Sequence, residues 1–290
     1  MDLTLTPELA AFRDEVRAFL EAHGDDYRDG VPADTKAWQK TLIAHGYAAR
    51  TIPKEYGGYG AEPDILKSRI IAEAFIEANA PRGMAGQGIS MLVPTLLEVG
   101  SEEQKRRWIP PTLAGDIIWC QGYSEPGAGS DLANLQTKAV EDGEDFLISG
   151  QKIWTSTAMQ AQMMFCLVRT EPDKPKHEGI SYILFPMSTP GIEVRPLKTM
   201  TGHAEFNEVF FTDVRVPVGA RLGAEGQGWE IVRSALVDER TGMAASIRVD
   251  KDLDAVIALA RSTGKTGDPV TRQKIAALAI SCHALKWSSA

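Results

Sequence analysis

The chain has 290 residues, of which 43% are hydrophobic and 24% charged, a composition typical of a globular protein with room for two or more domains. Its net charge of −8 argues against a nucleic-acid-binding surface or a basic membrane-facing patch, and no apolar run is long enough to span a membrane. The three cysteines fit no metal-ligand pattern, and no basic region followed by an apolar run opens the sequence, so we expect a reduced, cytoplasmic protein without a secretory signal.

Residues 1–118 are predicted to form a helical domain. Thr6 is followed by Pro7, which gives a helix start with a capping hydroxyl and then a proline at the first helical position. The run from Ser101 to Gln104 resembles a capping box at the start of a later helix. Apolar residues recur at helical spacing between these two points. The predicted helices span 7–23, 35–45, 65–77 and 89–99, the last kinked at Pro94, and one more begins at 101.

A strand and a glycine-rich loop follow, in the segment WCQGYSEPGAGSDLA of residues 119–133. The strand, residues 117–123, is rich in β-branched and aromatic side chains. The loop contains three turn-forming residues close together in the sequence: Pro126, Gly127 and Gly129. Small residues let a backbone approach a bulky anionic ligand, and glycines reach the positive φ angles that aim successive N–H groups at one point. The loop is therefore a candidate anion-binding site, with an ordinary surface turn as the alternative interpretation.

Polar side chains complete this loop. Ser124 and Ser130 add hydroxyl donors, and Asp131 is predicted to cap a short helical turn. The segment matches neither the dinucleotide fingerprint G-x-G-x-x-G nor a phosphate loop with G-K-[ST]. Any nucleotide would have to be bound by local groups of a different kind.

A second segment, LISGQKIWTSTA at residues 147–158, places a tryptophan beside hydroxyl groups. Trp154 is followed by Thr155 and Ser156. A tryptophan flanked by hydroxyls suits the edge and face of a flat heteroaromatic ring. A buried core tryptophan is the alternative interpretation.

Short strand-like runs separated by turns fill the region from 119 to 226. Their even spacing predicts a small antiparallel barrel or sandwich. The predicted strands after the glycine-rich loop span 135–140, 145–149, 152–155, 163–169, 180–186, 193–197 and 207–216.

From Gly228 the apolar residues return to helical spacing, which predicts a long helix as far as about Arg261 and another from Pro269. Such helices expose apolar faces unless other helices cover them, and exposed apolar patches mark interfaces. We therefore expect a dimer or tetramer, built from copies of this chain or with a different chain.

Together, SEPGAGSD and GQKIWTS resemble the flavin-binding signature of the acyl-CoA dehydrogenase family, and the resemblance extends over nearly all of the chain. It implies an α+β multidomain fold. The implied parts are an N-terminal helical domain at 1–118, a middle antiparallel β-domain with the flavin loop at 119–226, and the start of a C-terminal helical bundle, incomplete in this sequence, at 227–290.

The resemblance also implies the reaction. Members of the family use FAD to oxidise an acyl-CoA thioester to its trans-2-enoyl form, while a carboxylate removes the α-proton and a hydride passes from the β-carbon to flavin N5. The expected partners are an acyl-CoA substrate and an electron-transfer flavoprotein or similar acceptor, with no nucleic acid and no membrane.

Matching the family's motifs residue by residue predicts the cofactor contacts. The matched positions are Gln121, Tyr123, Ser124, Gly129, Ser130, Trp154, Thr155 and Ser156. The first three correspond to positions beside the isoalloxazine, the next two to the loop beside the pyrophosphate, and the last three to the segment packed against the flavin ring. Ser130 also corresponds to a position that touches the thioester ligand.

The catalytic base is expected at Glu239. Many relatives carry it late in the C-terminal bundle, in a motif like Y-E-G-[TS] that this sequence lacks, whereas a minority place it on the first bundle helix, one residue before an arginine. Glu239 precedes Arg240, which is expected to contact the substrate. A surface carboxylate paired with Arg240 is the alternative. The R-x-x-F-G element that meets a neighbouring subunit's FAD in relatives is replaced here by ARSTGKTGDP.

Two other functional classes remain open. One is a non-catalytic subunit of a mixed dehydrogenase, because TGHAEFNEVFF resembles bacterial relatives that oxidise steroid side-chain thioesters in mixed assemblies. The other is a flavin-dependent oxidase on the same scaffold, which would pass electrons to oxygen.

Overall fold

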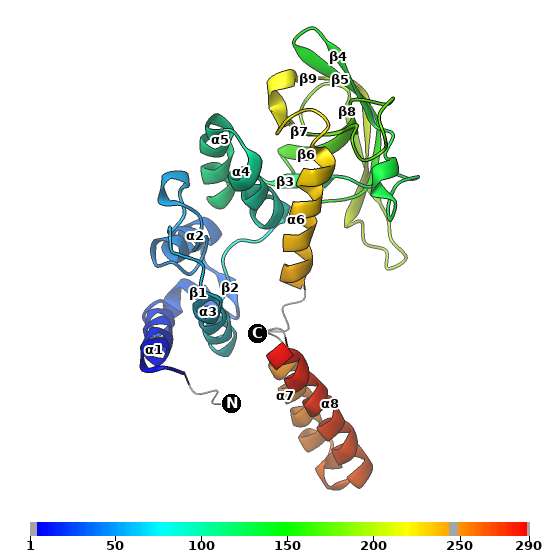
Figure 1. The fold of residues 1–290 in the computed structure, drawn as a ribbon. Helices are drawn as coiled ribbons and strands as arrows, with labels where there is room; N and C mark the ends of the chain where they lie inside the picture. Colours follow the sequence, from blue (N-terminus) through cyan, green and yellow to red (C-terminus); the bar gives the residue numbers. More distant parts are fainter. Residues whose placement is uncertain (1–4, 244–248, 289–290) are drawn as a thin grey trace. The chain divides into compact units, whose positions relative to one another are not determined.

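The computed structural model describes residues 5–243 and 249–288 (Figure 1). The chain divides into two compact units, and each is described by itself. One unit comprises 1–42, 62–83 and 240–290, and the other comprises 43–61 and 84–239. None of the described helices is both long and apolar enough to cross a bilayer.

The first unit begins with three helices and a small hairpin. These are α1 (Pro7–Ala22), β1 (Tyr27–Arg28), β2 (Val31–Pro32), α2 (Thr35–Ala44) and α3 (Ile65–Glu77). The Thr6 hydroxyl accepts a hydrogen bond from the Leu9 N–H, so the predicted start of the first helix is confirmed. Trp38 of α2 is buried, and its indole N–H donates to the Pro81 carbonyl at 2.8 Å.

Two further helices, α7 (Val249–Ser262) and α8 (Pro269–Ser288), form an antiparallel pair (Figure 1). The sequence predicted one long helix from Gly228 onward. The structure describes α6 (Gly228–Met243) and α7 on either side of 244–248, which lie outside the described residues. The large apolar side chains that α7 and α8 expose include Val256, Leu259, Val270, Leu278, Ile280 and Leu285.

The second unit is built around an eight-stranded sheet. Its strands are β3 (Trp119–Gly122), β4 (Lys138–Asp142), β5 (Asp145–Ser156), β6 (Met163–Arg169), β7 (Ile180–Pro186), β8 (Ile192–Leu197), β9 (Phe206–Pro217) and β10 (Arg221–Leu222). The strand order is β10-β7-β6-β4-β5-β9-β8, with β3 paired to β6. The β3–β6 and β4–β6 pairings are parallel, and the others are antiparallel.

A β-domain is thus confirmed, but of the predicted antiparallel barrel or sandwich, the barrel is not confirmed, because the described strands do not form a closed sheet. The strands from β3 to β10 form one open, mixed sheet with β10 and β8 at its ends. Strand spacing along the sequence predicted the strands themselves, whereas closure depends on hydrogen bonding between strands that are distant in sequence. The two runs predicted at 145–149 and 152–155 are a single strand, β5.

Strand β6 is buried along its whole length because two separate cores meet on it. Met163, Phe165 and Leu167 belong to a core shared with α4 (Val93–Val99), α5 (Glu102–Leu113) and α6. Met164, Cys166 and Val168 belong to a second core, shared with β5 and β9. Alternation along a strand places successive side chains on opposite faces, so this apolar run serves both cores.

The expected kink at Pro94 has a different form. Residues Gly88–Leu92 make one turn of π-helix, which continues directly into α4. Pro94 is the second residue of α4 and directly follows this wider turn, in a helix that is continuous through it. The helix irregularity therefore precedes the proline. The predicted capping box of Ser101 and Gln104 at the start of α5 is confirmed, since each side chain accepts the other's backbone N–H.

Candidate functional site

The loop after β3 is closed by two backbone hydrogen bonds. The Glu125 N–H donates to the Ala128 carbonyl at 2.9 Å, and the Ala128 N–H donates to the Glu125 carbonyl at 3.0 Å. Gly127 and Gly129 are exposed, and a Cβ on either would meet no atom within 4 Å. Neither glycine has a positive φ, so the expectation that they aim N–H groups from a left-handed backbone is wrong. Because these two glycines have no side chains, they leave the space above the loop open.

Asp131 does not act as the predicted helix cap. It precedes the 3₁₀ turn Leu132–Asn134 but makes no capping hydrogen bond to it. Its carboxylate instead accepts two hydrogen bonds from Lys176 Nζ, at 2.9 and 3.0 Å. A cation distant in sequence outcompetes the local backbone donor here. Ser130, the neighbouring residue, is exposed.

A buried ion pair joins the loop to β5. Lys152 Nζ lies 2.8 Å from Glu125 Oε1 and 3.0 Å from the Tyr123 carbonyl oxygen. The Glu125 carboxylate also accepts hydrogen bonds from the N–H groups of Gln136, at 2.6 Å, and Thr137, at 2.9 Å. Burial raises the pKa of Glu125, but the Lys152 ammonium and these hydrogen bonds outweigh burial and hold that pKa below its usual value. The folded structure therefore favours the ionised form of the Glu125 carboxylate.

The sequence analysis did not predict this pair. Phe146 and Ile148 are buried positions two residues apart in β5, and Lys152 continues the same alternation. A lysine on the buried face of a strand needs a partner, and that position is the signal for a buried ion pair. The partner, Glu125, is 27 residues away in the sequence.

Trp154 points out of the sheet because of a β-bulge. Between Lys152 and Thr155 the pairing of β5 with β9 slips by one residue, and Trp154 has a φ of 60°. Both features are uncommon for a bulky residue in a strand. After the buried Lys152, the slip makes Thr155 the next buried residue of β5 in place of Trp154. The Trp154 side chain is therefore 54% exposed. The alternative of a core tryptophan is therefore wrong. The Trp154 ring meets Phe206 edge to face, with the ring centroids 5.8 Å apart.

Beneath the bulge, two buried side chains hold polar atoms without partners. The Asn207 side-chain amide donates to the Thr155 carbonyl at 2.9 Å. Within the described part of the chain, Thr155 Oγ1 and Asn207 Oδ1 have no hydrogen-bond partner. A buried polar atom left unpaired is costly and rare, so these atoms are candidates for binding a polar ligand. Ser156, half-buried, is paired with Phe206 in the ladder between β5 and β9.

The side chains of Gln121 and Tyr123 are held differently. Gln121 is half-buried, and its carboxamide contacts the Gln87 amide at 3.4 Å and Met91 Sδ at 3.5 Å. Tyr123 is buried, and its hydroxyl donates to the Tyr182 hydroxyl at 3.1 Å. Tyr123 can therefore offer only backbone groups to a ligand, whereas the next residue, Ser124, is half-buried.

Glu239 and Arg240 lie in α6. Their side chains are outside the described residues. The predictions that Glu239 is the base and that Arg240 contacts the substrate therefore stay predictions.

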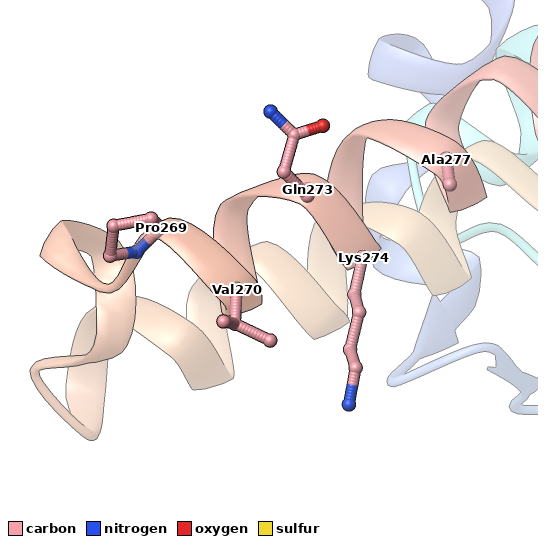
Figure 2. A pocket seen from close by; sticks show the side chains of 5 residues that line it. All are labelled: Pro269, Val270, Gln273, Lys274 and Ala277. Atoms are coloured by element: carbon pink, nitrogen blue, oxygen red, sulfur yellow. The ribbon is translucent and has the colours of Figure 1, made fainter.

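Two surface depressions differ in character. One, of about 280 Å³, adjoins the loop, and the residues that line it include Glu125, Asn134 and Gln151. The other, of about 460 Å³, runs along α8 (Figure 2) and is lined by Pro269, Val270, Gln273, Lys274 and Ala277. The residues that line the α8 depression do not form a pair of acid–base or nucleophilic groups.

In the described ranges, no group of His, Cys, Asp and Glu is arranged to hold a metal ion. The three cysteines are buried free thiols, and burial raises the pKa of Cys166 to about 12.

Comparison with known proteins agrees with the motifs. Residues 6–116 match the acyl-CoA dehydrogenase N-terminal domain, and residues 120–214 match the acyl-CoA dehydrogenase middle domain. The chain is 39% identical over 246 residues to acyl-CoA dehydrogenase IpdE1 of Mycobacterium tuberculosis, an alignment that covers 83% of this chain and 63% of that protein. Against IpdE1 of Mycolicibacterium smegmatis it is 39% identical over 292 residues, with 92% and 74% covered.

Solved structures with the same fold include the Tcur3481-Tcur3483 steroid ACAD, with a TM-score of 0.81 and 34% identity over all of this chain and 77% of that one. The ChsE4-ChsE5 complex from Mycobacterium tuberculosis gives a TM-score of 0.79 and 32% identity, over 100% of this chain and 76% of that one. Both conserved domains, the identities and the fold agree: the chain belongs to the acyl-CoA dehydrogenase family.

Proposed function

We propose that the chain carries the flavin site of an FAD-dependent acyl-CoA dehydrogenase, which converts an acyl-CoA thioester to its trans-2-enoyl form. The observation that carries the proposal is Trp154, a large ring that is 54% exposed on a left-handed backbone beside an open loop. Local strain of this kind persists where the surrounding structure enforces it, and it is concentrated at ligand sites. An exposed tryptophan is a suitable packing surface for an isoalloxazine.

The surrounding residues fit FAD. Thr155 Oγ1 is a buried hydroxyl without a partner in the described structure, and nothing stands over Gly129. The proposed contacts are Gln121, the Tyr123 backbone and Ser124 for the isoalloxazine, Gly129 and Ser130 for the pyrophosphate, and Trp154, Thr155 and Ser156 against the ring. FAD, when bound, would supply the hydride acceptor. Ser130 would also face the thioester.

The proton acceptor in this proposal is Glu239. An α-proton beside a thioester is weakly acidic, so the reaction needs a carboxylate within hydrogen-bonding reach of that proton. Glu239 lies on α6, the first helix after the β-domain, and Arg240 would bind the substrate beside it. The division into domains at 118 and 226 is part of the same proposal.

The relatives suggest the substrate and the assembly. Two similar structures are of the Tcur3481-Tcur3483 steroid ACAD and of the ChsE4-ChsE5 complex. We therefore propose a steroid side-chain or fatty acyl-CoA thioester as substrate and an electron-transfer flavoprotein or similar protein as electron acceptor. The apolar side chains that α7 and α8 expose support a dimer or tetramer, with a second copy or a different chain.

The experiment is to purify the protein with its co-expressed partner chains, record the flavin absorbance, and follow anaerobic bleaching by acyl-CoA thioesters. With a thioester that reduces the wild type, Glu239→Gln should slow flavin reduction at least about 100-fold, or roughly 2.7 kcal/mol of transition-state stabilisation, while flavin stays bound. Unchanged bleaching would place the base elsewhere. A complete assembly that binds no flavin would overturn the proposal, and rapid reoxidation in air would indicate an oxidase.

A non-catalytic subunit of a mixed dehydrogenase is the second candidate. Two observations favour it. The segment ARSTGKTGDP stands where the family has R-x-x-F-G, and the similar structures Tcur3481-Tcur3483 and ChsE4-ChsE5 are each named for two chains. Flavin content distinguishes the two candidates. If Glu239→Gln leaves the rate unchanged while a carboxylate variant of the partner chain abolishes it, the partner supplies the base.

A further inference from the structure

Three hydrogen bonds join the loop after β3 to strand β5. Lys152 Nζ donates to the Tyr123 carbonyl at 3.0 Å and to Glu125 Oε1 at 2.8 Å, and the Ile153 N–H donates to the Ser124 carbonyl at 2.9 Å. Two consecutive strand residues thus bind three consecutive loop residues. The sheet itself does not supply this connection, because β3 pairs with β6 and not with β5.

The ion pair at the centre of this connection is shielded from water. The exposed fractions of the Lys152 and Glu125 side chains are 0% and 7%. Taking two charges out of water is expensive, and apolar residues of similar size often give equal or greater stability than a buried ion pair. Stabilisation of the fold is therefore a poor explanation for this pair, and the geometry that it fixes is a better one.

That geometry concerns the two segments proposed to bind flavin. Ser124 lies between the two loop residues that accept from Lys152, and Trp154 lies two residues after Lys152. On the other side of the bulge, the Asn207 amide holds the Thr155 carbonyl. The backbone around Trp154 is thus fixed from two sides, from the loop and from β9.

We infer that Lys152 and Glu125 are positioning residues whose buried ion pair sets the placement of Ser124 relative to Trp154 for flavin binding. The inference rests on the proposed FAD site and adds residues that do not themselves touch the cofactor. It predicts that removing the pair impairs flavin binding even where the fold is fully retained.

The test compares Lys152→Met with the double variant Lys152→Met/Glu125→Gln. The single variant leaves the Glu125 charge buried and unpaired, so it should lose both stability and FAD affinity. The double variant removes both charges at nearly constant shape, so the apoprotein should recover much of the stability that the single variant loses. Recovery should be incomplete, because a glutamine amide has one acceptor oxygen for the two N–H groups of Gln136 and Thr137. FAD affinity, measured by titrating apoprotein, should remain about tenfold or more below that of the wild type. If the single variant does not fold, the double variant carries the test.

Two controls make the result specific. Arg195→Met removes an ion pair with Glu193 on β8 that is more than half exposed, together with the contact of the guanidinium with the Phe210 ring. It should change stability by no more than about 1 kcal/mol and leave FAD affinity unchanged. In a Trp154→Ala background the double variant should change FAD affinity less than about twofold, because a positioning residue acts through the ring that it positions.

A double variant that binds FAD as tightly as the wild type would overturn the inference. So would an equal loss of affinity with and without Trp154, because the pair would then act independently of the ring. A wild-type apoprotein that takes up no FAD, together with its partner chains, would overturn the proposed function and this inference with it. Wild-type binding with an unaffected double variant would overturn the inference alone.

Discussion

Replacing Thr155 by valine should stabilise the apoprotein and weaken its binding of FAD. Thr155 is 1% exposed, and its Oγ1 has no hydrogen-bond partner in the described structure. Burying a hydroxyl without a hydrogen bond costs about 1–3 kcal/mol in proteins. Valine has nearly the same shape without that cost, so Thr155→Val should raise the free energy of unfolding by about 1–2 kcal/mol.

The same change should remove one hydrogen bond to the ligand. A typical hydrogen bond contributes about 0.5–1.5 kcal/mol net, and 1.4 kcal/mol corresponds to a factor of ten in affinity. FAD affinity of Thr155→Val should therefore fall by up to about tenfold. Opposite signs for stability and affinity are the signature of a polar group kept for binding.

Urea unfolding of the apoprotein and FAD titration measure the two effects, with Thr112→Val as the matched control. Thr112 is also buried, but its hydroxyl donates to the Trp108 carbonyl at 2.6 Å and accepts from the Trp119 indole at 2.9 Å. The same substitution there should lower the free energy of unfolding by about 1–3 kcal/mol. If Thr155→Val also destabilises the apoprotein, or leaves FAD affinity unchanged, the Thr155 hydroxyl is not a ligand donor.

Three further predictions concern neighbouring residues. Trp154→Ala should weaken FAD binding about tenfold, because it removes the proposed packing surface for the flavin. It should change the stability of the apoprotein by less than about 1 kcal/mol, because the ring is 54% exposed. A large loss of stability would mean that the ring supports the fold. The pKa of Glu125 is lowered on folding, so its contribution to stability is complete above the unfolded value, near 4.5, and is lost as pH falls through the folded value. Urea midpoints between about pH 7 and about pH 3 should accordingly fall less steeply for Glu125→Gln than for the wild type. In the same assay, Gly150→Ala should lower the free energy of unfolding by about 2 kcal/mol or more. Gly150 has a φ of 152°, and a Cβ at this position would lie 2.7 Å from Thr137 Cα. An unchanged free energy of unfolding would show that the strand can shift to make room.

Signals between close neighbours in the sequence predicted much of the secondary structure. The Thr6 cap and the reciprocal pair of Ser101 and Gln104 marked helix starts that the structure confirms, because a cap involves only the next three residues. The apolar run of β6 predicted a strand. Its burial by two separate cores was decided by which strands and helices pack on each face.

For the candidate site, the sequence indicated the segments and the tertiary structure decided how their residues are presented. Trp154 was a candidate from its neighbours, but its exposure depends on a one-residue slip against β9. The glycines of the loop were expected to take a left-handed backbone, yet the loop closes between Glu125 and Ala128 without it.

The link between the two segments depends on Lys152 reaching a carboxylate 27 residues earlier in the chain. Capping and periodicity depend on neighbours along the chain, and they are readable in one sequence. Strand register, burial and charge pairing depend on neighbours in space, and folding alone brings those together.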